Sequence, residues 1–369
     1  MDEWRSFHVY YTNPDRILLE CIAPLLRSFK ADLNLCFWER HYAGGPHIRA
    51  RFKGDDPQLT MVEQRFVTAV ESYLAEFPSV PVSSYSAEDA RRLLEVEGEA
   101  YQRGDLEYRV NVIRPCTYQR LNSHFIQGPG LQFLHEFLHD SNPVSEAILK
   151  DSAAKRNHLL RMYFLNALVS LGSLARGSVS FKSHWSGFAA AFPNNAATQR
   201  IRDSFEKQQH AIIAAMLEVQ RRYDSQDFSG DPILQEWHTL LQRYREKSLA
   251  ILQAGEPIGL TIGPEEIRKY RDSLANQNEP NEFIQVLLKD ERFVASFHHE
   301  KALAGPRALT NLLYMIIPTV GLTVLDRMAF CYYAHRAVET YFQCDLTDVL
   351  RETIAVFVGG AARTPAPNA

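Results

Sequence analysis

The chain has 369 residues, 46% of them hydrophobic, and a formal net charge of −4. This size and apolar content are enough for a full hydrophobic core, so folding needs no structural metal and no disulfide framework. The slight acidity argues against a general nucleic-acid-binding protein, and five scattered cysteines without a CxxC pair provide no zinc-site spacing.

The first third of the chain predicts a small sheet with accompanying helices. A short strand is expected at Phe7–Tyr11. Asn13-Pro14-Asp15 then provides an N-cap, a proline in the first turn and an early acidic residue, which together start a helix. Pro24 is expected to kink or end this helix, because proline lacks the backbone N–H that the helical pattern needs.

A hairpin is the most informative segment of the sequence. Its two strands, Leu33–Arg40 and His47–Phe52, are joined by a Gly-Gly-Pro turn. Side chains of a strand alternate between two faces, which places three polar residues together, namely His47, Arg49 and Arg51. The other face is apolar, with Ile48, Ala50 and Phe52. Two guanidiniums on such a strand would form a rigid receptor for a carboxylate or phosphate. The alternative is a solvated edge strand whose arginines pair with glutamates.

The rest of the chain is predominantly helical in pattern. A helix is predicted at Pro57–Phe77 and a strand near Tyr108–Ile113. Apolar residues at helical spacing then predict further helices. They are Leu131–His139, Ser152–Leu174, Ala197–Tyr223, Pro232–Leu252, Pro264–Leu274, Arg307–Ile317 and Thr323–Phe342. The tail at 359–369, rich in Gly, Ala and Pro, is expected to be disordered. The sequence therefore predicts an α+β protein, with an N-terminal antiparallel sheet that contains the hairpin and a largely helical remainder.

One segment resembles a metal site. His135-Glu136-Phe137-Leu138-His139 has the HExxH spacing that zinc proteases use to place two histidines on one helix face. No third-ligand motif follows it, and the predicted helix is short, between Gly130 and Pro143. We therefore expect an amphipathic helix with surface histidines and no metal, with zinc at His135 and His139 as the alternative.

The predicted helix Thr323–Phe342 is the second region with candidate chemistry. Arg327, Cys331 and His335 recur every four residues, so they share a helix face. Tyr332 and Arg336 form a second pair of this kind, with Tyr333 beside them. Aromatic residues on a helix are usually core residues, and no base that could activate Cys331 as a nucleophile can be identified from the pattern.

The sequence predicts neither export nor membrane insertion. The first residues lack a basic segment followed by an apolar run, so no secretory signal is expected. The most apolar window, Leu312–Leu325, is interrupted by Pro318 and Gly321 and is too short to cross a bilayer. We therefore expect a soluble protein of the cytoplasm.

These residues together resemble a known family. The N-terminal strand and helix residues and the Arg40–Phe52 hairpin follow one another at the distances found in the C-terminal domain of lantibiotic dehydratases and in stand-alone thiopeptide-type bacteriocin biosynthesis proteins. The likeness is weaker at Arg307–Tyr314 and Thr323–Glu339. Pro46–Phe52 is its most specific part, since the family has Pro-His-Leu-Arg-Leu-Arg-Phe here. The resemblance implies a single domain of this type over residues 1–358, with a helical middle.

In family members that eliminate glutamate, two strand arginines help to bind the glutamyl group on a modified Ser or Thr. Arg49 and Arg51 match them. His124 stands where an Arg-Tyr-Gly-Gly motif has its arginine, and Cys331 stands where the C-terminal helix has a histidine. These two departures weaken the elimination hypothesis, because a proton-transfer group and a carboxylate ligand would be missing.

The same fold is used by pyridine synthases, which catalyse a formal [4+2] cycloaddition between two dehydroalanines of a leader-bearing peptide. That reaction asks for a pocket that folds the peptide and for donors that polarise an amide. By this resemblance the catalytic candidates are Cys331, Tyr332, Tyr333 and His335. The substrate-binding candidates are His47, Arg49, Arg51, His124, Tyr314 and Arg336.

The resemblance thus implies a tailoring enzyme for ribosomally made peptides that forms a macrocycle without a cofactor. Its expected partner is the precursor peptide, with leader and dehydrated core, and other enzymes of the modification pathway are candidate partners. One alternative is the glutamate-elimination subunit of a split tRNA-dependent dehydratase. A second is a non-catalytic peptide-binding module, which could carry the same substitutions. Neither nucleic acid nor membrane is an expected partner.

Overall fold

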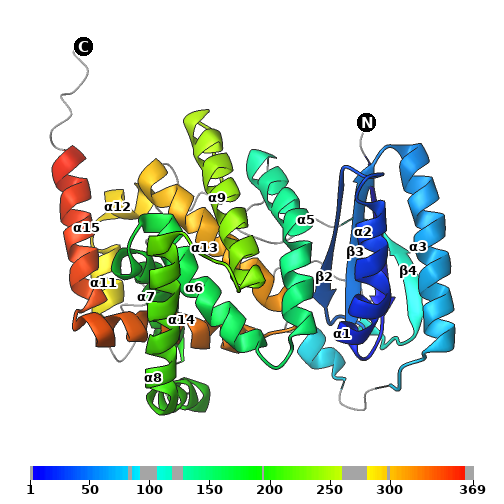
Figure 1. The fold of residues 1–369 in the computed structure, drawn as a ribbon, viewed down its shortest axis with the longest axis horizontal. Helices are drawn as coiled ribbons and strands as arrows, with labels where there is room; N and C mark the ends of the chain where they lie inside the picture. The colour runs from blue at the N-terminus through cyan, green and yellow to red at the C-terminus, as the bar shows by residue number, and fades with distance from the viewer. Residues whose placement is uncertain are drawn as a thin grey trace. The chain divides into compact units, whose positions relative to one another are not determined.

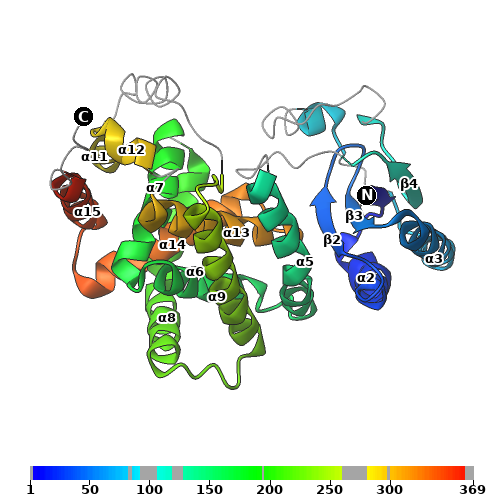
Figure 2. The same cartoon turned by 90° about the horizontal axis from the view of Figure 1, so that it is seen from above.

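The computed structural model describes residues 3–81, 85–91, 106–118, 128–192, 195–259, 281–296 and 300–361. The chain forms two compact units (Figures 1 and 2). Unit 1 contains Met1–Ser152 and Pro318–Leu322, and unit 2 contains Ala153–Ile317 and Thr323–Ala369. His124 and the predicted helix Pro264–Leu274 lie outside the described residues. The expectation of a single domain stays a prediction.

Unit 1 is built on a four-stranded antiparallel sheet. Its strands are β1 (Glu3–Tyr10), β2 (Leu35–His41), β3 (His47–Gly54) and β4 (Val112–Cys116), in the order β2-β3-β1-β4. The predicted hairpin is β2 and β3, joined through Gly44 and Gly45 at φ values of 74° and 113° that favour glycine. Because β3 is an inner strand, the solvated edge strand of the alternative is wrong, whereas its pairing of arginine with glutamate is found at Arg51 and Glu39.

Two helical segments cover one face of this sheet (Figure 2). The first comprises α1 (Pro14–Ile17), the π-helical turn Leu18–Ile22 and α2 (Ala23–Phe29), and the second is α3 (Asp56–Glu76). Pro24 does not end the helix; the wider turn before it accommodates the missing N–H. An Asp55–Gln58 capping box starts α3.

An aromatic core lies between the sheet and these helices. The ring centroids of Phe52 and Phe66 are 5.0 Å apart, and those of Phe7 and Phe66 are 5.5 Å apart. Ile48 and Ala50 are fully buried beside Phe52. The predicted apolar face of the second hairpin strand is therefore confirmed as the core face.

The edge of β2 is covered by α5 (Gly128–Lys150). The amide of Asn142 donates to the Cys36 carbonyl at 3.0 Å, which satisfies a backbone acceptor of the edge strand. The expectation of a short helix ending before Pro143 is wrong, since α5 continues through this proline for two further turns.

Residues Pro318–Leu322 are held in unit 1 by Arg40. Its Nε donates to the Thr319 carbonyl at 2.8 Å, and its guanidinium pairs with Asp15 at 2.5 Å. Gly321 has φ 77°, and a Cβ there would lie 2.9 Å from the Arg40 guanidinium. The positive φ therefore favours glycine at this position, and a larger residue would also have to displace the Arg40 guanidinium.

Unit 2 is helical throughout its described residues. Its helices are α6 (Lys155–Leu171), α7 (Leu174–Ala191), α8 (Ala196–Ser225), α9 (Pro232–Gln253), α11 (Glu282–Leu288), α12 (Glu291–Ser296), α13 (Lys301–Thr319), α14 (Val324–Phe342) and α15 (Leu346–Ala361). Of these, α7, α11, α12 and α15 were not predicted. Helix α14 packs against α6, α7 and α8, which makes it the central helix of the unit (Figure 1).

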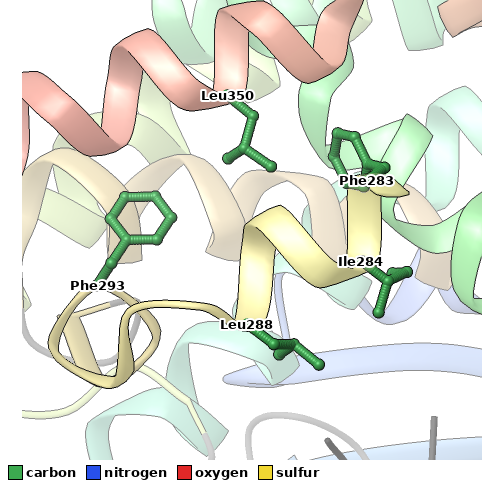
Figure 3. Packing of buried hydrophobic residues seen from close by; sticks show 5 residues of the cluster. All are labelled: Phe283, Ile284, Leu288, Phe293 and Leu350. Atoms are coloured by element: carbon green, nitrogen blue, oxygen red, sulfur yellow. The ribbon is translucent and has the colours of Figure 1, made fainter. Parts of the chain in front are cut away.

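A small hydrophobic cluster holds α15 in place (Figure 3). Leu350 of α15 lies against Phe283, Ile284 and Leu288 of α11 and Phe293 of α12. Because α15 extends to Ala361, the first residues of the predicted disordered tail are helical; 362–369 lie outside the described residues. In the part of the chain that the structure describes, no helix is long and apolar enough to span a membrane.

Candidate functional site

The sheet face opposite α2 and α3, here called the polar sheet face, gathers the polar residues of the hairpin. Residues directly opposite each other in an antiparallel sheet share a face, so register defines rows across all four strands. The central row is Glu39, Arg49, His8 and Arg114. On either side lie the row of His41, His47, Tyr10 and Val112 and the row of Phe37, Arg51, Ser6 and Cys116.

Both strand arginines are buried on this face. Arg51 is 1% exposed; its guanidinium donates to the Ser6 hydroxyl, lies 5.2 Å from the Tyr118 ring and has Nε 3.4 Å from a Glu39 carboxylate oxygen. Burial lowers the pKa of Arg51, which the neighbouring Glu39 opposes. Arg49 is 6% exposed and lies opposite Glu39. Their shared face is confirmed, and their role as ligands of a bound group stays a prediction.

His47 is held as a neutral ring at one end of the polar sheet face. Its Nδ1 lies 2.9 Å from the Gly45 carbonyl, which can only accept, so Nδ1 carries the proton. The His8 and Tyr10 rings lie 4.8 and 4.5 Å away. Burial, followed by the neighbouring His8, lowers the pKa of His47 well below its usual value. His47 therefore offers Nε2 as a hydrogen-bond acceptor.

The histidines of the HExxH segment contact the sheet. His135 is hydrogen-bonded through Nε2 to the Tyr118 hydroxyl, and burial lowers the pKa of His135 to about 4. The Nδ1 atom of His139 lies 3.0 Å from the backbone of Cys36. The expectation of surface histidines is wrong for His135, which packs between Trp4 and Phe37. Among the described residues, no group of three or more His, Cys, Asp or Glu could hold a metal ion.

In unit 2, Cys331 of α14 lies against two tyrosines. The Tyr314 hydroxyl is 3.4 Å from the Cys331 sulfur, and Tyr163 of α6 contributes a second hydroxyl beside it. All three side chains are buried. Burial raises the pKa of Cys331 to about 11 and that of Tyr314 well above its usual value. These three side chains consequently carry hydroxyl and thiol protons at neutral pH.

His335 is held by its own helix and by Glu339. Its Nδ1 donates to the Cys331 carbonyl at 2.9 Å, and its Nε2 lies 4.0 Å from Glu339. Glu339 also accepts from Lys182 at 2.6 Å and from Arg336 at 3.0 Å. Burial lowers the pKa of His335 to about 4, so the ring is neutral at pH 7. An imidazolium donor is therefore not supported at this position.

The predicted tyrosines of α14 lie on another side of the helix. Tyr332 is buried with its ring 4.5 Å from Trp185 and 5.7 Å from Phe205, and Tyr333 is half-buried, 6.2 Å from Phe205. The structure thus brings Cys331 and Tyr314 together but places Tyr332 and Tyr333 against α7 and α8.

Sequence reasoning missed two members of the Cys331 cluster. Tyr163 comes from α6, and His184 of α7 has its ring 4.8 Å from that of Tyr314. No local motif marks either residue, because they meet Cys331 only through helix packing.

The chain is similar to a known family and to two solved structures. The family model "lantibiotic biosynthesis dehydratase C-term" matches residues 4–338. A solved pyridine synthase from thiomuracin biosynthesis, TbtD, is similar with a TM-score of 0.68 and 22% identity, covering 91% of this chain and 98% of that chain. The crystal structure of TsrL is similar with a TM-score of 0.67 and 15% identity, covering 95% and 98%.

No curated protein matches the sequence. The two solved structures share the architecture of this chain, which confirms the α+β prediction. Since the family model extends over most of both units, the chain belongs to the family of lantibiotic biosynthesis dehydratase C-terminal domains.

Proposed function

We propose that this chain is a tailoring enzyme of ribosomally made peptides that joins two dehydroalanines of a leader-bearing precursor in a formal [4+2] cycloaddition. The observation that carries the proposal is the likeness in fold to a pyridine synthase, which extends over 91% of this chain and 98% of that enzyme. A fold hosts several activities, so the choice among them rests on the chemistry of the candidate residues.

The residues on α14 favour cycloaddition over glutamate elimination. Elimination needs a base that removes the α-proton of the modified residue. By the resemblance, Cys331 stands where eliminating members have a histidine. Burial raises the pKa of this thiol to about 11, so it stays protonated at neutral pH. A buried thiol of this kind is a poor base.

Cycloaddition asks instead for positioning and for a donor to an amide oxygen, which favours the iminol form. The Tyr314 hydroxyl is such a donor, since burial raises its pKa and keeps its proton in place at neutral pH. Tyr332 and Tyr333 remain candidates for contacts with the peptide from the neighbouring side of α14.

On unit 1, we assign peptide binding to His47, Arg49 and Arg51. Guanidiniums of the two arginines can donate to carbonyl or carboxylate oxygens, and the neutral His47 ring can accept from an amide N–H. The partner in this proposal is the precursor peptide, with other enzymes of its pathway as further partners.

Mass spectrometry on two substrates tests the proposal. A leader-bearing peptide that contains dehydroalanines is expected to become a macrocycle with loss of the leader, and a glutamylated peptide is expected to stay unchanged. Loss of glutamate from the glutamylated peptide, with no ring formed from the dehydroalanine peptide, would favour elimination. The feature that supports elimination is the presence of Arg49 and Arg51 on one buried face. Activity on neither peptide would leave a peptide-binding module.

A further inference from the structure

Arg327, in the first turn of α14, is a half-buried cation whose charge has no acidic partner among the described residues. Its guanidinium carbon lies 5.2 Å from the centre of the Tyr314 ring, and its buried Nε has no hydrogen-bond acceptor. The neighbouring Asp326 is engaged elsewhere: it pairs with Arg156 at 2.6 Å and accepts from Thr323 at 2.9 Å. A buried donor without an acceptor is unfavourable, and so is a cation near the positive end of a helix.

Two other arginines that are withdrawn from water have carboxylate partners. Arg161 of α6 pairs with Glu218 at 3.1 Å and with Asp231, and in unit 1 Arg40 pairs with Asp15. These pairs show how the fold ordinarily compensates a guanidinium that is withdrawn from water. Arg327 has no such carboxylate among the described residues, so the carboxylate of a ligand can supply the missing partner.

Two phenols and a thiol face Arg327 from the surrounding helices. They belong to Tyr163 of α6, Tyr314 of α13 and Cys331 of α14. The His184 ring of α7 lies against Tyr314. Burial keeps the thiol of Cys331 protonated despite the guanidinium, which lowers its pKa. Neither phenol supplies a negative charge at neutral pH, and neither does the thiol. The phenol of Tyr314 can donate a hydrogen bond to a ligand that binds Arg327.

We propose that Arg327 is a carboxylate-binding residue, and that its guanidinium, beside the Tyr314 ring, receives a carboxylate of the precursor peptide. Guanidinium is suited to this ligand because its planar N–H groups match the two carboxylate oxygens. The carboxylate can come from an acidic side chain or from the C-terminus of the peptide. The identity of the peptide as ligand rests on the proposed function, whereas the carboxylate site does not.

The site itself is tested with sodium acetate as the probe, at constant ionic strength, on the full-length chain. A ligand that binds the folded state raises the melting temperature. We expect acetate to raise that of the wild type and of Arg245→Gln, an exposed arginine of α9, but not that of Arg327→Gln. An equal response of Arg327→Gln and wild type would overturn the site.

The same variants separate a binding role from a structural one. If Arg327 is uncompensated without a ligand, Arg327→Gln keeps or raises the melting temperature in acetate-free buffer. A clear drop in that buffer, together with an unchanged acetate response, would make the contact with Tyr314 structural and would refute the proposal.

The source of the carboxylate is found with the precursor peptide in a fluorescence-anisotropy titration. We expect Arg327→Gln to weaken binding about ten- to hundred-fold, and Arg327→Lys to weaken it less. Two modified peptides distinguish the sources: one has a C-terminal carboxamide, and the other has its leader acids replaced by amides. The peptide that lacks the carboxylate bound by Arg327 should bind wild type and Arg327→Gln with equal affinity. If the wild type does not bind the peptide, the proposed function fails and the acetate result alone decides the site.

Discussion

On the polar sheet face, Arg51 has a carboxylate and a hydroxyl partner that strand register brings close, whereas near the start of α14 the Arg327 cation lies among hydroxyl and thiol groups. Arg51 has Glu39 and Ser6 within its row or the adjacent one. Among the residues that the structure describes, the Arg327 guanidinium contacts the ring of Tyr314, and its Nε has no hydrogen-bond acceptor. The first arrangement pairs a buried guanidinium with a carboxylate of the protein itself, and in our proposal a ligand supplies the carboxylate in the second.

This difference predicts where substitutions act. On the polar sheet face, removing a charge leaves its buried partner uncompensated, so the main effect should fall on stability. On α14, substitution of Arg327 or Cys331 should leave the fold intact. Loss of the Arg327 cation should weaken peptide binding, whereas loss of the Cys331 thiol should leave activity nearly unchanged. The following predictions begin with the largest expected effect.

Arg51→Met should lower the free energy of unfolding by about 3 kcal/mol, because Glu39 and Ser6 lose a buried partner. Arg114→Met, on the same face but exposed on β4, is the matched control and should change stability by less than about 0.5 kcal/mol. Chemical denaturation of the full chain measures both. Equal effects of the two variants would mean that register does not compensate the charge of Arg51.

Acidification should destabilise both units over the same pH range. Burial lowers the pKa of His135 in unit 1 and of His335 in unit 2 to about 4, from an ordinary value of 6.5. Since the unfolded chain binds these protons first, stability present above pH 6.5 is lost as the pH falls towards 4, by up to about 3 kcal/mol for each histidine.

Melting temperatures between pH 7 and pH 4 check this effect. His135→Gln and His335→Gln should each flatten the curve, whereas His210→Gln, an exposed histidine of α8, should leave it unchanged. A wild-type profile that stays flat over this range would show that neither ring is held neutral by burial.

Arg49→Ala should weaken peptide binding by about 1.5–3 kcal/mol if its guanidinium makes a charge-assisted contact with the substrate. The residue lies in the central row of the polar sheet face, opposite Glu39. The dissociation constant of the precursor peptide is the quantity to measure, together with the melting temperature. Unchanged affinity with a lowered melting temperature would assign Arg49 to the fold alone.

The two regions also differ in how far the sequence predicts them. Period-two alternation was enough to place His47, Arg49 and Arg51 on one face and Ile48, Ala50 and Phe52 in the core. The partners of these residues were not predictable, because the register of β1 and β4 against β3 depends on contacts between segments far apart in the sequence. Local patterning therefore predicts the face but not the neutralising neighbour.

Helical spacing predicted α14 to within one residue but assigned its faces only in part. Cys331 and Arg327 do share a side, yet Tyr332 packs on Trp185 and lies apart from them. Each side of α14 meets a different helix, and α7 was not predicted at all. The contact between Tyr314 of α13 and Cys331 of α14 joins two different helices, and helical spacing within one helix does not predict it.

Cys331→Ser should have the smallest effect. Its thiol is buried against Tyr314 with a pKa raised to about 11, so it contributes a weak hydrogen bond and volume but no base. If cycloaddition is the reaction, serine preserves both features, and we expect turnover within about twofold of wild type, a change below about 0.5 kcal/mol in the activation free energy.

Tyr314→Phe is the informative companion, because it removes the donor and keeps the ring that lies under Arg327. Single-turnover kinetics on the dehydroalanine peptide measure both variants. A large loss in Cys331→Ser with normal activity in Tyr314→Phe would reverse the roles assigned to the two residues and make the thiol, not the phenol, the group that acts on the peptide.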